Sequence, residues 1–99
     1  MKIDFSTRLK NFDGTDAEED KKPLVLASVC VNSLLGVYSD EQQLPGTEKA
    51  KRYELALKIK DGGTIDLPVE DIAKLKELVG KAYAPIVVGQ AYKMLETSA

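Results

Sequence analysis

The residues of this sequence that could hold a metal ion or a phosphate lie in two polar segments. Asp13 and Asp16 belong to an acidic segment, and a calcium ion requires several oxygen ligands of this kind. The spacing fails, because placing Gly14 at the turning position of an EF-hand loop puts Leu9, which has no side-chain oxygen, at the first ligand position. Residues 46–49 read Gly-Thr-Glu-Lys and lack the Gly-Lys-Ser/Thr run of a phosphate-binding loop. The sequence therefore predicts no metal site and no cofactor.

The ionisable side chains form no pattern for acid–base or nucleophilic catalysis. Glu70 and Asp71 are neighbours on an expected helix, where adjacent residues point about 100° apart and cannot flank one reacting atom. The absence of histidine excludes serine and cysteine triads that rely on imidazole. Cys30 lies between Val29 and Val31, so we expect it to be a small core side chain. We therefore expect a protein that is not an enzyme.

Composition and charge restrict the class of protein and of partner. The chain has 43% hydrophobic and 30% charged residues, which is typical of one globular domain. A net charge of −2 argues against nucleic acid, and the basic residues of the segment 49–60 alternate with acidic ones, as on a solvated, salt-bridged helix. The longest apolar segment, 24–31, is too short to span a membrane, and residues 1–5 do not resemble a secretory signal. We expect a soluble protein in the cytoplasm.

The elements of the first half are short. Residues 2–5 alternate as on a strand, and the polar segment 11–22 is expected to be a mobile loop. After Pro23, the apolar segment 24–35 is expected to begin as a strand and continue as a helix that stops at Gly36.

Residues 48–60 carry conflicting signals. Four apolar side chains alternate as on a strand: Tyr53, Leu55, Leu57 and Ile59. The abundance of Glu, Lys, Ala and Leu favours a helix instead, with Thr47 as its cap and Gly62 and Gly63 as its end. We expect the helix, with a hairpin as the alternative. Its apolar residues would lie on two nearly opposite faces, which predicts a position in the middle of a bundle.

The last third predicts two amphipathic helices. Residues 64–67 are expected to pair with residues 2–5, and Pro68 to open a helix with Glu70 and Asp71 near its positive end. Pro85 then begins a final helix. Gly80 and Gly89 suggest a close crossing of two backbones. The fold class is therefore mainly α (α+β), a compact bundle of about four helices with a short two-stranded β element.

The apolar residues of these two helices outnumber what a lone helical hairpin could hide. The surplus must pack against the rest of the domain or against another protein. The candidate partner-binding residues are Tyr83, Ile86, Val88, Tyr92 and Leu95. The same wide apolar face allows a homodimer.

Three segments, 52–59, 66–72 and above all 80–91, resemble a group of small uncharacterised proteins encoded by bacteriophages and prophages. The resemblance covers about the last half of the chain. It implies expression in bacterial cytoplasm and action by contact with other proteins. We expect a protein that regulates or inhibits a host protein or defence complex, with a virion-assembly accessory such as a tail assembly chaperone as the alternative. The resemblance assigns no functional residue.

Overall fold

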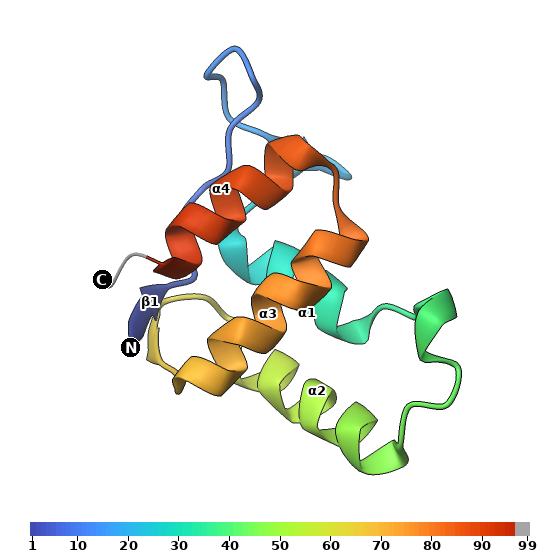
Figure 1. The fold of residues 1–99 in the computed structure, drawn as a ribbon. Helices are drawn as coiled ribbons and strands as arrows, with labels where there is room; N and C mark the ends of the chain where they lie inside the picture. Colours follow the sequence, from blue (N-terminus) through green and yellow to red (C-terminus); the bar gives the residue numbers. More distant parts are fainter. Residues whose placement is uncertain (97–99) are drawn as a thin grey trace.

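Helices make up most of the fold of this protein, whose computed structural model describes residues 1–96 (Figure 1). Within that range the α-helices are α1 (Leu26–Leu35), α2 (Gly46–Ile59), α3 (Val69–Ala82) and α4 (Pro85–Glu96), and a short 3-10 helix η1 (Ser39–Glu41) lies between α1 and α2. Together with a small two-stranded sheet, they confirm the predicted α+β helical bundle. None of these helices is long and apolar enough to cross a membrane.

A short antiparallel sheet joins the start of the chain to its second half. Strand β1 (Lys2–Asp4) pairs with β4 (Thr64–Asp66), and Ile3 lies opposite Ile65. The N-terminal amine donates a hydrogen bond of 2.8 Å to the Asp66 carboxylate. The predicted pairing of residues 2–5 with 64–67 is therefore confirmed, and it fixes the position from which α3 starts.

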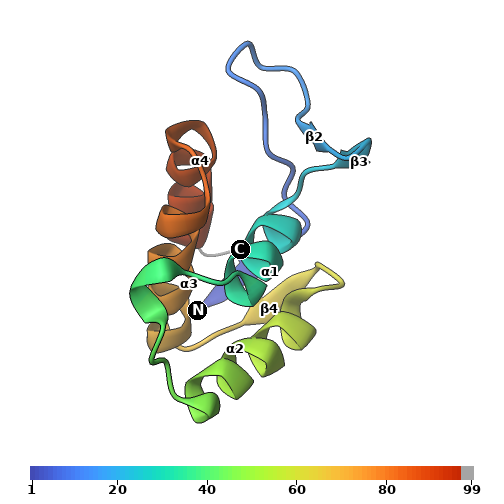
Figure 2. The ribbon, with the colours of Figure 1, turned by 90° about the vertical axis from the view of Figure 1, so that its right-hand side faces the viewer.

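The polar segment 11–22 contains more regular structure than the predicted loop. Strands β2 (Glu18–Glu19) and β3 (Lys22–Pro23) form a hairpin whose turn residues, Asp20 and Lys21, have positive φ angles of 52° and 65°. A second turn, residues 11–15, extends away from the helices (Figure 2). The segment expected to be a polar, mobile loop thus contains a hydrogen-bonded turn and a short hairpin. Its mobility stays a prediction.

Helix α1 is the central helix, since it contacts each of the other three. Residue Val25 pairs with Arg8 in an isolated bridge just before α1 begins, as expected for a segment that starts extended and continues helical. Cys30 is fully buried, which confirms its predicted core position, and burial raises the pKa of its thiol to about 12.

Residues 46–59 form helix α2, so the helix prediction is confirmed over the hairpin. Thr47 does not cap it, because the helix begins one residue earlier and the Pro45 carbonyl accepts the amides of Glu48 and Lys49, both at 3.1 Å. Gly62 ends it, with φ of 75° and an amide that donates to Ile59.

The expected position of α2 in the middle of the bundle is wrong. One face is buried through Arg52, Ala56 and Ile59, whereas Tyr53 and Leu57 on the other side are exposed. The reason is that α1 covers only one side of α2, and α1 itself occupies the centre.

Helices α3 and α4 form the predicted amphipathic pair. Glu70 and Asp71 lie in the first turn of α3, where the helix dipole favours their charge. A Cβ added at Gly80 would lie 2.8 Å from the Tyr92 hydroxyl, while nothing lies within 4 Å of one added at Gly89. The predicted close crossing of backbones is therefore wrong. Gly80 makes room for a side chain, and nothing in the structure explains Gly89.

Candidate protein-binding groove

The predicted partner-binding residues of α4 are mostly turned into the protein itself. Leu95 is fully buried in the core, so assigning it to a docking surface is wrong. Val88 is half-buried and packs against the core. Ile86 retains 40% exposure, more than any other large apolar residue of α4. The reason is that β1, α1 and α3 all contact α4 and cover most of its apolar side chains.

The two predicted tyrosines are half-buried, and their hydroxyl groups bond within the chain. Tyr92 donates a hydrogen bond of 2.9 Å to the carbonyl of Lys76. The Tyr83 hydroxyl accepts one of 3.0 Å from the side-chain amide of Asn32. Both tyrosines therefore act first as links between helices. Whether either also contacts a partner stays a prediction.

Among residues 1–96, the most exposed large aliphatic side chain lies where the chain leaves α1. Val37 is 99% exposed, and Leu35, two residues before it, is also exposed. They line a hollow of about 630 Å³ between the end of α1, η1 and α2. Its other apolar walls are Leu34, Tyr38 and Leu44. We call this hollow the α1–α2 groove.

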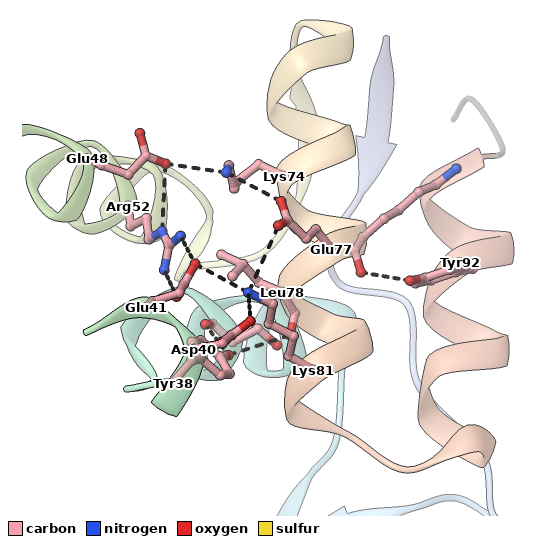
Figure 3. Close-up of polar contacts among 12 residues, drawn as sticks. Tyr38, Asp40, Glu41, Glu48, Arg52, Lys74, Glu77, Leu78, Lys81 and Tyr92 are labelled. Carbon is pink, nitrogen blue, oxygen red and sulfur yellow. Dashed lines mark hydrogen bonds and ion pairs between the residues drawn. The ribbon is translucent and has the colours of Figure 1, made fainter. Parts of the chain in front are cut away.

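Two residues of the groove lining, Arg52 and Glu41, form a buried ion pair. Figure 3 shows this pair. The guanidinium of Arg52 on α2 donates to both carboxylate oxygens of Glu41 on η1, at 2.8 and 2.7 Å. These hydrogen bonds hold the pKa of Glu41 at about 2, well below the ordinary 4.5. The two-pronged contact fixes η1 against α2 and therefore sets the width of the groove.

Helix α3 supplies a cation to the same cluster (Figure 3). The Lys81 ammonium lies 3.1 Å from Asp40 and 3.3 Å from Glu41, and its pKa is raised chiefly by Asp40. It also lies 5.5 Å from the ring centroid of Tyr38, whose hydroxyl donates to the Ser33 carbonyl at 2.6 Å. The segment that carries Val37 is thus tied to α1, α2 and α3 at once.

The ion pairs continue on the other side of Arg52. The Nε atom of Arg52 lies 3.7 Å from the Glu48 carboxylate. This nitrogen is buried and forms no hydrogen bond in the described part of the chain. Lys74 on α3 lies 3.5 Å from Glu48 and 3.4 Å from Glu77. Positive and negative groups alternate here, and the ion pair between Glu48 and Lys74 joins α2 to α3. The sequence indicated a solvated position for Arg52, and its burial corrects that view.

No metal-binding arrangement is found among residues 1–96, where no three Cys, Asp or Glu side chains gather closely enough to hold an ion. The Asp13 carboxylate accepts hydrogen bonds from the backbone and hydroxyl of Thr15, at 3.0 and 2.6 Å. Its pKa is lowered by these bonds, with the side-chain bond as the larger cause. Asp13 therefore stabilises a turn.

Sequence reasoning missed the groove because its residues follow no helical period. Leu35 and Val37 flank Gly36, the predicted end of a helix, and apolar residues at that point have no periodic pattern to place them. A weak signal was available. An aliphatic residue directly after a helix stop and before a polar connection has no helix face on which to be buried.

Comparisons with protein-family models, curated proteins and solved structures found no match. The resemblance to phage-encoded proteins, and the cytoplasmic location that it implies, therefore stay predictions.

Proposed function

We propose that this protein acts by binding another protein, and that the α1–α2 groove receives apolar side chains of the partner. The observation that carries the proposal is the nearly complete exposure of Val37 at the mouth of a hollow whose walls include Leu34 and Leu35. Exposed apolar surface rimmed by polar groups marks contacts between proteins, and the anchor side chains of a partner fill pockets in such surfaces. Lys49 and Gln42 supply such groups here.

The energetics favour the groove over α4. Fully burying one valine or leucine side chain contributes about 1.5–3 kcal/mol. Arg52, Glu41 and Lys81 already hold the groove in shape, so little conformational entropy is lost when a partner binds. On α4, by contrast, Ile86 offers less than half of its surface. We therefore propose the α1–α2 groove, rather than the predicted α4 residues, as the binding surface.

Two valine substitutions test the proposal. Val37→Asp places a charge in the groove, and Val69→Asp places the same charge on a valine that is 72% exposed at the start of α3, outside the groove lining. Tagged wild-type and variant proteins would be used to capture partners from a bacterial lysate. We expect the V69D variant to capture the same proteins as the wild type. The V37D variant should fail to capture them. Equal capture by both variants would contradict the proposal.

The biological setting is a separate prediction. The phage resemblance points to a host protein or defence complex as the partner, which the protein would regulate or inhibit. A role in virion assembly is the alternative. Neighbouring head or tail genes, together with defective particles when the gene is deleted, would favour assembly. Normal particles in a deletion strain would exclude it.

A further inference from the structure

Phe12 is the most exposed aromatic residue among residues 1–96, at 96% of its full accessible surface. It belongs to the turn 11–15, which backbone hydrogen bonds close. The segment that contains this turn extends away from the helices (Figures 1 and 2). A fully exposed phenylalanine gains nothing from the fold of its own chain. Large aromatic side chains are, however, frequent anchors at protein contacts.

The turn that carries Phe12 is held by many hydrogen bonds. Asn11 donates its backbone amide to the Thr15 carbonyl at 2.8 Å, and Gly14 donates to the Asn11 carbonyl at 3.0 Å. Gln90 on α4 binds the backbone at the start of the turn. Its side-chain oxygen accepts a hydrogen bond of 2.8 Å from the backbone amide of Lys10, and its side-chain nitrogen donates one of 2.9 Å to the Lys10 carbonyl. Phe12 is therefore presented from a preformed backbone, which lowers the entropy lost when it binds.

The α1–α2 groove is complementary to this turn in polarity and charge. It is an apolar hollow of about 630 Å³ with room for a phenylalanine side chain. The charged residues of the groove lining are Glu41, Arg52 and Lys49. Glu41 and Arg52 pair with each other, which leaves the positive charge of Lys49 at the groove. Asp13, next to Phe12, brings a negative charge. Opposite charges around an apolar contact favour one register of docking.

The turn 11–15 lies at the other end of the molecule from η1 and α2 (Figures 1 and 2), and residues of η1 and α2 line the groove. Resting on the proposed role of the groove, we propose that the Phe12 turn of one copy inserts into the α1–α2 groove of a second copy. The contact joins two different surfaces, the Phe12 turn of one copy and the groove of the other. Two copies can therefore bind each other reciprocally in a closed dimer, or successive copies can form an open chain. A partner protein then competes with the second copy for the same groove.

Phe12→Ser and Val37→Asp are suitable test variants because both residues are almost fully exposed, so neither change removes a contact within the monomer. Sedimentation of the full chain would measure association. The wild type should exceed the 10.8 kDa mass of one chain as concentration rises. Each variant alone should associate at least about tenfold more weakly. Val69→Asp is the control and should associate like the wild type.

Mixing the two variants gives the decisive result. The Phe12→Ser variant keeps an intact groove and the Val37→Asp variant keeps an intact Phe12, so an equimolar mixture should form a heterodimer through one restored contact. A wild type that stays a single chain up to about 1 mM would overturn the proposal. So would a Phe12→Ser variant that associates like the wild type, or a mixture no stronger than its components.

The two proposals fail separately. Phe12 is needed for self-association only, so the Phe12→Ser variant should still capture a partner through Val37. Loss of self-association with retained Val37-dependent capture leaves the groove's function intact. Association through Phe12 and Val37 without any captured partner would instead support the self-contact and remove the proposed function.

Discussion

Glu41→Gln is the substitution that most strongly tests how the groove is held. Gln has nearly the same shape as Glu but no charge, so it leaves the guanidinium of Arg52 buried without its counter-ion. The side chains of Arg52 and Glu41 are only 5% and 13% exposed. Removing one partner of a buried pair costs about 3–5 kcal/mol.

Two contacts reduce that cost. Glu48 remains 3.7 Å from Nε, and the new amide oxygen at position 41 can still accept one hydrogen bond. We therefore expect a loss of about 2–3 kcal/mol in the free energy of unfolding. For a domain of about this size, that corresponds to a Tm lowered by about 10–20 °C.

Thermal and urea unfolding, followed by far-ultraviolet circular dichroism, would measure the effect. Asp61→Asn is the matched control, because Asp61 forms an ion pair with Lys60 at 3.2 Å but is 86% exposed. We expect no resolvable change in its Tm, since exposed pairs contribute little. Adding Arg52→Met to Glu41→Gln should recover stability by removing the unpaired charge. A Glu41→Gln variant as stable as the Asp61→Asn variant would refute the reasoning.

The remaining predictions concern acid, two glycines and the cysteine. The pKa of Glu41 falls from 4.5 to about 2 on folding, so its contribution to stability is complete above pH 4.5 and is lost between pH 4.5 and 2. The free energy of unfolding of the wild type should fall by this contribution over that pH range, and that of Glu41→Gln should not. Gly89→Ala should stabilise the protein by about 0.5–1 kcal/mol. Gly80→Ala displaces Tyr92 from the Lys76 carbonyl and should therefore be less stable than Gly89→Ala by about 1 kcal/mol. Equal Tm values for the two variants would contradict this. Cys30 should react with a thiol reagent only as fast as the protein opens, and immediate labelling at pH 8 would exclude its buried position.

The elements that were predicted correctly have strong local signals. Helix α3 follows from apolar residues three and four apart, and the pairing of β1 with β4 follows from two short alternating segments. The helix expected over residues 48–60 is confirmed as α2, because composition and the following glycines outweighed the alternation of Tyr53 to Ile59. Local sequence is sufficient where one period dominates.

The arrangement of the helices depends on contacts that no local pattern encodes. Counting apolar residues on α3 and α4 indicated a surplus for a partner, yet β1 and the central α1 provide the missing surface, and Leu95 is buried there. Arg52 is buried because Glu41 meets it from a segment eleven residues away, so hydrophobic periodicity places neither residue. The residues that line the groove come from the end of α1, from η1 and from α2, so no single periodic segment predicts it.

The central claim is that the α1–α2 groove is the binding surface. A photoreactive amino acid incorporated at position 37, with position 69 as the control, would test it most directly in bacterial cells that express the protein. If the groove binds a partner, discrete cross-linked species should form from position 37, and none of those species should form from position 69. The same cross-linked species from both positions, or none from position 37 when position 69 reacts, would contradict it.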